Sequence, residues 1–388
     1  MGEYHEKKIV IFTVSMGAGG AERVISLLLP KLIEDYEVHL ILMYNSIYYE
    51  IPREVKVQAV FPNAKNNLCR KLTSLSKTRK FLNDYLNSKK IDCVISFLTR
   101  PNIIAGMLKQ NAPNIRFILS ERNYTHLMYS SRTAIESRFI KWMIQKFYNR
   151  ADALFGNSNY IIEGLRKDYG IRIPMKVIYN PIIIPPKAIN LNNSATQEEK
   201  VRKIITVGSF KEVKNHALLI HAMSKLPNHH LTIFGDGTLR DSYVAQIKRL
   251  NLEKLVSLPG QTSHIQETLL DYGIFVLSSD TEGFPNALLE ALSVGIPTIS
   301  TNCFSGPLEM LNENKAINIP RGKFAIAKYG ILVNPKDEEG LVAAILHLSS
   351  NSELYNHYSI VGRERAKHYD LSNIYREIKS LIEVSANI

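Results

Sequence analysis

Two carboxylates flank a predicted helix start in residues 281–290, which read TEGFPNALLE. Residues 274–277 before it are apolar and favour a strand, and Pro285 suits the first turn of a helix. The first N–H groups of such a helix have no internal partner and lie at the positive end of its dipole, so they can bind a diphosphate. Glu282 would lie beside this anion site, and Glu290, one to two turns further on, could hydrogen-bond a ribose. The alternative is an acidic N-terminal cap followed by an ordinary Glu.

A second candidate for the same chemistry is Lys214, which precedes a predicted helix over residues 215–224. Its ammonium group could reach a diphosphate, assisted by the N-terminus of that helix. Lys211 is either a second positive charge for the same anion or a solvated loop lysine. A retaining glycosidase needs two carboxyl groups about 5 Å apart, one on each side of the bond that breaks. Glu282 and Glu290 would instead lie along one helix start, so a retaining glycosidase is disfavoured.

Metal and redox chemistry are not expected. Asp280 and Glu282 have D-x-D spacing, but Glu282 already belongs to the stronger motif. The three cysteines, Cys69, Cys93 and Cys303, are far apart and lack metal-ligand spacing, so we interpret them as reduced cytosolic thiols. We therefore predict neither a metal nor another cofactor.

A glycine cluster, GAGG at residues 17–20, follows a predicted strand and opens a helix. In a dinucleotide-binding G-x-G-x-x-G pattern the third glycine would fall on Glu22, and the next strand, at residues 39–44, ends without an acid for a ribose. This spacing argues against an NAD enzyme. A glycine turn needed only for strand–helix packing is the alternative.

These candidates lie in a pattern of short strands that alternate with helices over all 388 residues, which is too long for one typical core. The pattern predicts two parallel, doubly wound α/β domains. The predicted strands are residues 7–14, 37–43, 92–97, 116–120, 153–155, 176–179, 204–207, 231–234, 255–258, 274–277, 298–300 and 330–333. We predict an N-terminal domain over residues 1–184, a linker over 185–200, a C-terminal domain over 201–370 and a final helix within 371–388.

The positive charge is concentrated in the N-terminal half. Residues 63–150 hold seventeen Lys and Arg against four Asp and Glu, whereas the net charge of the whole chain is only +12. Two predicted amphipathic helices lie there, at residues 68–86 and 135–147. Their candidate membrane contacts are Arg70, Lys71, Leu72, Leu75, Phe139 and Trp142. The alternative is that both apolar stripes face the domain core. No run of about 20 apolar residues predicts a membrane span, and no recognition motif predicts nucleic-acid binding.

Several motifs resemble the retaining glycosyltransferases of family 4. Besides residues 281–290 they are VGSFKEVKN at 207–215, IFGDG at 233–237, VGIPT at 294–298, SGPLE at 305–309 and YGILV at 329–333. The resemblance implies the GT-B fold, two Rossmann-like domains facing a cleft, with the last helix crossing back to the first domain. It also implies a front-face displacement in which the leaving phosphate takes the acceptor proton.

By this resemblance Glu282 is the catalytic residue that orients the donor sugar. The implied donor-binding residues are Gly19, Gly20, Lys214, Gly283, Phe284, Pro285, Asn286, Ala287, Leu288 and Glu290. The chain departs from the family at Ser209, where an Arg is usual, and at residues 121–123, where many relatives place a His. Arg23, Glu121 and Arg122 are the candidate acceptor contacts; Arg122 either binds an acceptor diphosphate or pairs with Glu121, and His126 could replace the missing His.

Residues 15–30, 36–43 and 49–52 further resemble the N-acetylgalactosaminyl transferases of bacterial N-linked protein glycosylation. This implies α-1,4 transfer of GalNAc from a UDP-sugar to an undecaprenyl-diphosphate saccharide at the cytoplasmic face of the inner membrane, with the protein bound peripherally to an anionic surface. Three alternatives stay open: a family 4 transferase of lipopolysaccharide, O-antigen or capsule assembly, a nucleotide-sugar 2-epimerase, and a basic membrane-binding scaffold without enzyme activity.

Overall fold

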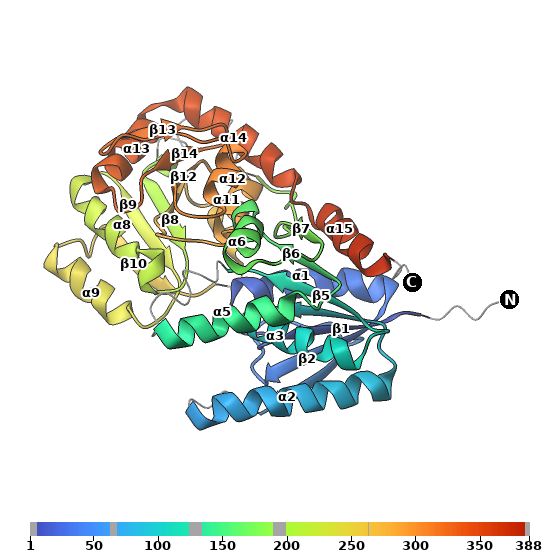
Figure 1. The fold of residues 1–388 in the computed structure, drawn as a ribbon. Coiled ribbons are helices and arrows are strands. Elements are labelled where there is room, and N and C mark those ends of the chain that lie inside the picture. Colours follow the sequence, from blue (N-terminus) through green and yellow to red (C-terminus); the bar gives the residue numbers. More distant parts are fainter. Residues whose placement is uncertain (1–5, 63–67, 124–133, 189–198, 263, 385–388) are drawn as a thin grey trace. The chain divides into compact units, whose positions relative to one another are not determined.

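The computed structural model describes residues 6–62, 68–123, 134–188, 199–262 and 264–384; of residues 68–73 and 134 it describes only the backbone. The chain forms two compact units (Figure 1). Unit 1 comprises Met1–Pro181 and Leu371–Ile388, and unit 2 comprises Ile182–Asp370. Of the expected linker, residues 185–188 and 199–200 belong to unit 2, and residues 189–198 lie outside the described residues.

Unit 1 is built on a parallel sheet with the strand order β3-β2-β1-β4-β5-β6-β7. The central strands β1, β2 and β4 are almost entirely buried because helices cover both faces of the sheet. The strand order reverses between β1 and β4, and that is the point where ligands usually bind in such folds. The strands are β1 Lys8–Thr13, β2 Glu37–Tyr44, β3 Lys56–Phe61, β4 Cys93–Phe97, β5 Arg116–Glu121, β6 Ala153–Gly156 and β7 Met175–Val177.

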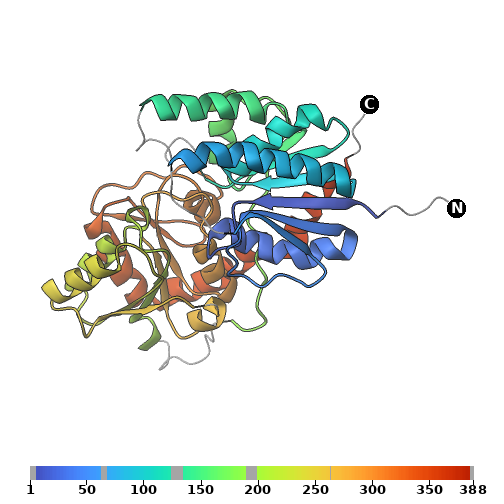
Figure 2. The same ribbon diagram turned by 90° about the horizontal axis from the view of Figure 1, so that it is seen from below.

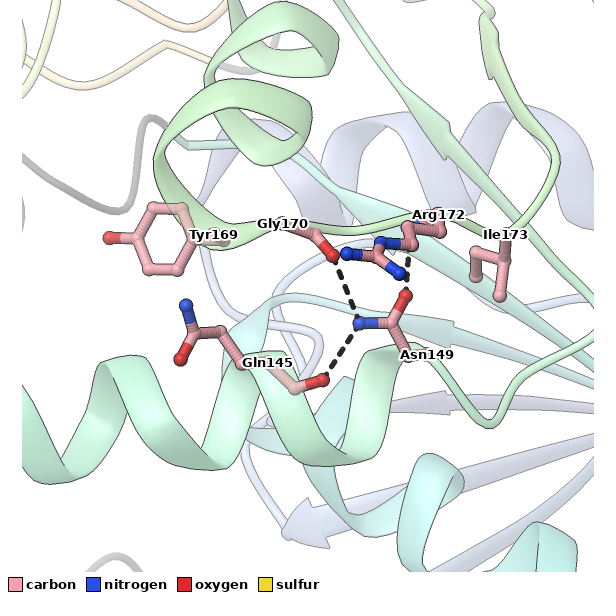
Figure 3. A pocket seen from close by; sticks show the side chains of 6 residues that line it. All are labelled: Gln145, Asn149, Tyr169, Gly170, Arg172 and Ile173. Carbon is pink, nitrogen blue, oxygen red and sulfur yellow. Dashed lines mark hydrogen bonds between the residues drawn. The ribbon is translucent and has the colours of Figure 1, made fainter.

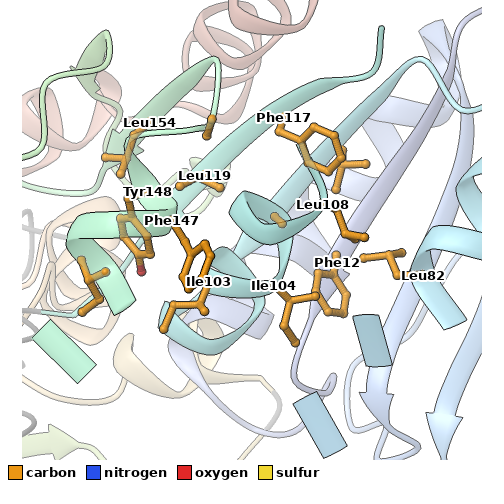
Figure 4. Packing of buried hydrophobic residues seen from close by; sticks show 14 of the residues in the cluster. Phe12, Leu82, Ile103, Ile104, Leu108, Phe117, Leu119, Phe147, Tyr148 and Leu154 are labelled. Carbon is orange, nitrogen blue, oxygen red and sulfur yellow. The ribbon is translucent and has the colours of Figure 1, made fainter. Parts of the chain in front are cut away.

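Helices cover the two faces of this sheet unequally. Helices α2, α3, α5 and α6 pack on one face around Phe12, Ile104 and Phe117 (Figure 4). Helix α1 and the C-terminal helix α15 cover the other face, where they lie against each other (Figure 2). The helices of unit 1 are α1 Gly20–Asp35, α2 Leu68–Lys89, α3 Thr99–Leu108, α5 Ala134–Tyr148, α6 Asn159–Tyr169 and α15 Leu371–Glu383.

The two basic helices differ in what their apolar sides contact. In α2 the described apolar residues Leu75, Leu82 and Leu86 pack on the unit 1 core, as in the core-facing alternative for this helix. The side chains of Arg70, Lys71 and Leu72 lie outside the described residues.

In α5, Met143 and Phe147 are buried, but Ile135, Phe139 and Trp142 remain 80%, 53% and 48% exposed. Among the described residues of the two helices, the strongly exposed large apolar side chains therefore all lie on α5.

The C-terminal helix α15 joins unit 1 although 189 residues of unit 2 precede it in the chain. Leu371, Ile374, Tyr375, Ile378 and Ile382 form its buried stripe at the three- and four-residue spacing of a helix. Polar contacts fix its C-terminal part: Lys379 pairs with Asp35 of α1 at 2.7 Å, and Arg116 Nε donates to the Leu381 carbonyl at 2.8 Å. The helix completes the second face of the unit 1 sheet.

Unit 2 repeats the doubly wound design, with the order β10-β9-β8-β11-β12-β14-β13. All its strand pairs are parallel except β13 with β14. Here the order reverses between β8 and β11. The strands are β8 Lys203–Val207, β9 His230–Phe234, β10 Val256–Gly260, β11 Ile274–Leu277, β12 Thr298–Thr301, β13 Phe324–Ile326 and β14 Ile331–Val333.

The helices of unit 2 again enclose the sheet. Helices α8, α9 and α13 pack on one face around Leu219, Ile247 and Ile345, and α11 contacts β11 and β12 as well as α10 and α14. The helices are α8 His216–Ala222, α9 Arg240–Arg249, α10 Ile265–Leu269, α11 Asn286–Val294, α12 Pro307–Asn312, α13 Glu338–Ser350 and α14 Ser352–Lys367, with a 3₁₀ turn η2 over Glu212–Lys214.

The strand predictions fail where a strand is short or lies at a sheet edge. The strands β3 and β13 were missed, because β3 is a partly exposed edge strand and β13 is only three residues long. The strand predicted at residues 176–179 lies at Met175–Val177. Pro285, predicted in the first turn of a helix, instead lies one residue before it. It caps α11 in an extended conformation, and the helix begins at Asn286.

Removing buried volume from α15 should destabilise unit 1. Ile378 is 2% exposed, so Ile378→Ala should lower the free energy of unfolding by about 3 kcal/mol through lost burial and a residual cavity. Chemical denaturation measures the change, with Arg376→Ala on the exposed side of the same helix as the matched control. Equal effects of the two substitutions would contradict this packing of α15.

Candidate functional site

The loops after β8 and β11 lie side by side because these two strands pair at the point where the strand order of unit 2 reverses. Backbone and side-chain bonds join the loops. The Asp280 amide donates to the Val213 carbonyl at 2.9 Å, Ser278 Oγ donates to the Lys214 carbonyl at 3.0 Å, and Asn215 Nδ2 donates to Asp280 Oδ1 at 3.0 Å. The topology therefore brings together two segments that are about 70 residues apart in sequence.

Lys214 and Glu282 meet at this junction. Lys214 Nζ lies 2.6 Å from Glu282 Oε1 and 2.8 Å from Oε2. Ser279 Oγ donates to the same Oε1 at 2.6 Å. The Glu282 side chain is 8% exposed, whereas that of Lys214 is 25% exposed. The cation predicted for a diphosphate and the carboxylate predicted for a sugar are thus direct partners in the structure.

Helix α11 begins three residues after the Glu282–Gly283 segment. Its cap, Pro285, makes no side-chain capping bond, and the N-terminal amides of a helix are an anion site. The loop before it is fixed by two bonds: the Glu282 amide donates to the Phe304 carbonyl at 3.1 Å, and Ser305 Oγ donates to the Gly283 carbonyl at 2.7 Å. The start of α11, whose free amides could bind an anion, thus follows Glu282 by four residues.

The remaining predicted donor contacts of this segment differ in accessibility. Phe284 is 4% exposed, with its ring edge-on to Tyr369, and Leu288 is fully buried. Any donor contact of these two residues would come from the backbone, as is also expected of Gly283, Asn286 and Ala287 at the helix start. Glu290, in the second turn of α11, is 7% exposed. Its contact with a ribose stays a prediction.

His216 supports the loop that carries Lys214. Its ring is 2% exposed and lies edge-on to Phe210 and Tyr243, with centroids 5.7 and 5.9 Å away. Burial lowers the pKa of His216 to about 4. Lys211, three residues before Lys214, is exposed, which fits its interpretation as a solvated lysine as well as a charge available to a ligand.

In unit 1 the glycine cluster ends at the N-terminus of α1, with Gly19 as the cap. A side chain at Gly19 would clash with the Glu22 carboxylate, since a Cβ there would lie 2.2 Å from Glu22 Oε2. Arg23 follows in the first turn, with its guanidinium 5.8 Å from the centre of the Tyr49 ring. The cluster lies at the carboxyl end of β1, next to the reversal point of the unit 1 sheet.

Glu121 is completely buried at the carboxyl end of β5. It accepts a 2.6 Å hydrogen bond from the Tyr148 hydroxyl and weaker bonds from Thr99 Oγ1 at 3.3 and 3.4 Å. Burial raises the pKa of Glu121, and these hydrogen bonds oppose the shift. A contact of this carboxylate with an acceptor stays a prediction.

Arg122 is 4% exposed and lies between two rings, with its guanidinium 5.2 Å from the centres of both Phe97 and Phe155. Nη1 donates to Asn180 Oδ1 at 2.8 Å, while Nε and Nη2 have no hydrogen-bond partner among the described residues. Burial lowers the pKa of Arg122 to about 9. Within the described residues no ion pair joins its side chain to Glu121, so that alternative is not supported.

Sequence reasoning missed three residues that hold these groups: Ser279, Tyr148 and Asn180. Ser279 could have been found from its position three residues before Glu282 in a loop. Nothing in the sequence around Tyr148 and Asn180 indicates their roles, because their partners, Glu121 and Arg122, are 27 and 58 residues away in the chain. His126 lies outside the described residues.

Unit 1 also has a surface pocket. It is formed where the end of α5 meets the segment after α6 (Figure 3). Asn149 links the two elements, because it donates to the Gly170 carbonyl at 3.2 Å and accepts from the Arg172 amide at 2.7 Å. None of the predicted site residues lines this pocket. Groups of three or more metal-ligating side chains are also absent from the described residues.

Two Rossmann-like domains define the GT-B class of α/β proteins, and comparisons with known proteins identify the family. Residues 18–184 match Glycosyltransferase Family 4, and residues 189–365 match Glycosyl transferases group 1. The chain belongs to the family 4 glycosyltransferases.

Two relatives come from Campylobacter jejuni. One, N-acetylgalactosamine-N,N'-diacetylbacillosaminyl-diphospho-undecaprenol 4-alpha-N-acetylgalactosaminyltransferase, is 31% identical over 96% of this chain and 98% of its own length. The other, GalNAc-alpha-(1->4)-GalNAc-alpha-(1->3)-diNAcBac-PP-undecaprenol alpha-1,4-N-acetyl-D-galactosaminyltransferase, is 25% identical over 97% of this chain and 98% of its own.

Solved structures share the fold at low sequence identity. Sucrose-phosphate synthase from Thermosynechococcus elongatus superposes with a TM-score of 0.80 at 16% identity, over 97% of this chain and 98% of that one. Anabaena HepE, solved with UDP and glucose, gives a TM-score of 0.73 at 16% identity, over 98% of this chain and all of the other. These likenesses confirm the predicted GT-B fold.

The buried His216 should make stability depend on pH. Its folded-state pKa of about 4 lies below the ordinary value of 6.5, so the unfolded state takes up a proton first as the pH falls. The stability that comes from the neutral ring is fully present above pH 6.5 and is lost as the pH falls toward 4. Between pH 7.5 and 5.0 this loss should be about 2 kcal/mol.

Chemical denaturation at these two pH values measures the loss. His216→Phe should remove about that part of the pH dependence, whereas His230→Phe, at an exposed histidine of β9, should leave the dependence unchanged. An unaltered pH dependence in His216→Phe would refute the assignment.

Proposed function

We propose that this protein is a retaining glycosyltransferase that moves GalNAc from UDP-GalNAc to an undecaprenyl-diphosphate-linked saccharide, with an α-1,4 linkage. The observation that carries the proposal is the junction of Lys214, Glu282 and the start of α11 at the reversal point of the unit 2 sheet. The Campylobacter jejuni relative at 31% identity, by its name a 4-alpha-N-acetylgalactosaminyltransferase on such a lipid, supports the sugar, linkage and acceptor.

In this proposal the donor diphosphate binds the first amides of α11 and the ammonium of Lys214. These groups stabilise the negative charge that develops on the leaving diphosphate, which is the largest electrostatic demand of the reaction. Glu282 faces the sugar, where it orients the hydroxyls and favours positive charge on the ring. Glu290, one to two turns into the helix, holds the ribose.

Retention follows from a front-face displacement, in which the acceptor hydroxyl attacks from the side of the leaving group. The bond from the anomeric carbon to the phosphate oxygen breaks, the bond to the acceptor oxygen forms, and the acceptor proton moves to the leaving phosphate. This route requires no separate protein base. We also propose that it requires no metal, since Lys214 and the helix amides supply the positive field.

The acceptor side is proposed to lie in unit 1. Arg23 in the first turn after β1, and Glu121 and Arg122 at the end of β5, lie at the same edge of one parallel sheet. Gly19 and Gly20, which are proposed to contact the donor, lie at this edge as well. Arg122 would bind an acceptor diphosphate only if its guanidinium became more accessible, because it is 4% exposed. The reason to keep it as a candidate is that Nε and Nη2 find no hydrogen-bond partner within the described part of the chain.

A peripheral contact with the cytoplasmic face of an anionic membrane is proposed for α5. No helix of the described residues is long and apolar enough to span a bilayer. On α5 the exposed rings of Phe139 and Trp142 stack, with centroids 5.8 Å apart, and Lys146 Nζ lies 4.8 Å from the centre of the Trp142 ring. Exposed aromatic rings beside lysines suit an interface with anionic headgroups.

The alternatives remain distinguishable. Another family 4 transferase of lipopolysaccharide, O-antigen or capsule assembly would share the donor machinery but use a different donor or acceptor. A nucleotide-sugar 2-epimerase would convert its donor without an acceptor, and a membrane-binding scaffold would turn over no donor.

A donor screen tests the proposed reaction. Purified protein is incubated with UDP-GalNAc, UDP-GlcNAc, UDP-Glc, UDP-Gal or GDP-Man, with and without short undecaprenyl-diphosphate saccharides. We expect transfer only from UDP-GalNAc and only with a lipid saccharide. Glu282→Ala should lower transfer at least about 100-fold, since it removes a charge from the reacting centre.

Glu253→Ala is the matched control, because Glu253 is an exposed carboxylate in the same unit. Its transfer rate should equal that of wild type. Near-wild-type transfer by a folded Glu282→Ala variant would refute the catalytic role, and transfer from another donor would assign the protein to a different pathway of the same family.

Vesicle sedimentation tests the proposed membrane contact. The double variant Phe139→Ser/Trp142→Ser should bind vesicles that contain anionic lipid at least about 10-fold more weakly than wild type, because it removes the apolar anchor while the lysines remain. Ile360→Ser, at a residue 59% exposed on α14 of unit 2, should bind as wild type does. Unchanged binding by the double variant would exclude α5 as the anchor.

A further inference from the structure

We propose that Ser279 is the positioning residue of Glu282, and that it keeps this carboxylate in place when Lys214 exchanges Glu282 for the donor diphosphate. The inference rests on the proposed function, because it assigns roles within the same site. It starts from the hydrogen bonds around Glu282, where one oxygen, Oε1, accepts from both Lys214 and Ser279.

In the ligand-free site Lys214 already has an anionic partner. Its ammonium contacts both oxygens of Glu282 at 2.6 and 2.8 Å. An ammonium has three N–H directions, of which Glu282 takes two and leaves one for a ligand. In this proposal the donor diphosphate contacts Lys214 through two of its oxygens, so at least one Lys214–Glu282 bond lengthens or breaks.

The two donors to Glu282 differ in their freedom to move. The Lys214 side chain is 25% exposed and has four rotatable bonds, so it can turn toward a ligand. Ser279 is 1% exposed, and its carbonyl accepts a 2.5 Å bond from Thr301 Oγ1 at the end of β12. Since Thr301 is itself fully buried, the Ser279 backbone is fixed to the sheet.

When Lys214 turns to the diphosphate, Ser279 is thus the donor that remains on Glu282. A carboxylate only 8% exposed would be left poorly solvated without it. The Ser279 hydroxyl compensates part of that charge and fixes the direction of the other oxygen, Oε2, toward the sugar. Loss of the Ser279 hydroxyl should consequently impair the chemical step more than the binding of the sugar nucleotide.

Steady-state kinetics with the donor that wild type uses test this role. Ser279→Ala should lower kcat about 10- to 100-fold while KM for the donor changes less than about threefold. Ser279→Thr, which retains the hydroxyl, should recover at least about a third of the wild-type kcat. The control is Ser300→Ala, because Ser300 is also fully buried but donates to the carbonyl of Thr301 and not to Glu282; its kcat should stay within about twofold of wild type.

UDP binding by calorimetry provides a second readout. Ser279→Ala should bind UDP within about threefold of wild type, because the groups for the diphosphate remain, whereas Lys214→Ala should bind UDP at least about 10-fold more weakly. A Ser279→Ala variant that loses UDP affinity as strongly as Lys214→Ala would show a general collapse of the loop and overturn the proposal.

A double-mutant cycle separates positioning of Glu282 from a merely structural role. In single-turnover reactions at high enzyme concentration, Ser279→Ala should reduce the rate of the Glu282→Gln enzyme less than about twofold, because its effect acts through the carboxylate. An equal reduction in both backgrounds, or a wild-type kcat in Ser279→Ala, would refute the inference. The absence of turnover by wild type with every donor would instead refute the proposed function.

Discussion

The candidate functional site depends on the ion pair between Lys214 and Glu282, which joins two loops across the reversal point of the unit 2 sheet. Neither loop has regular structure of its own beyond one 3₁₀ turn. Their geometry is instead fixed by bonds between them, and by the parallel strands that deliver both at one edge. The carboxylate of this pair is largely buried, whereas the lysine has access to solvent. This difference is the basis of the proposal that Lys214 turns to an incoming diphosphate while Glu282 stays in place.

The two units use one architecture for different purposes. In unit 2 the reversal point carries opposite charges and a partly exposed helix start, which suits an anionic ligand. In unit 1 the comparable edge holds glycine turns and deeply buried polar groups. Glu121 is held by Tyr148 there, and Arg122 is enclosed by two phenylalanine rings. Such buried polar groups cost desolvation energy, and evolution retains them mainly where they fix geometry or act on a ligand.

Amphipathic sequence alone could not separate core helices from interfacial ones. The stripes of α2 and α5 look alike as sequence, yet Leu82 and Leu86 of α2 are core residues whereas Phe139 and Trp142 of α5 are about half exposed. Any surface helix needs an apolar side toward its own domain. The spacing of apolar residues therefore predicts that one side of the helix is buried, but not which neighbour covers it. The neighbours that decide this are set by the folded sheet: α3 contacts both α2 and α5, and α6 contacts α5.

The sequence by itself determined the doubly wound class, the place of most strands, the helix that follows Gly283, and Lys214 and Glu282 as candidates. These features are local, since they follow from apolar runs, turn residues and helix-start signals. Tertiary structure alone decided that Lys214 faces Glu282, that Ser279 supports the carboxylate, and that Asn180 holds Arg122. Each of those contacts joins segments through strand order, loop conformation or a chain crossover, and spacing along the chain does not encode which side chains finally meet.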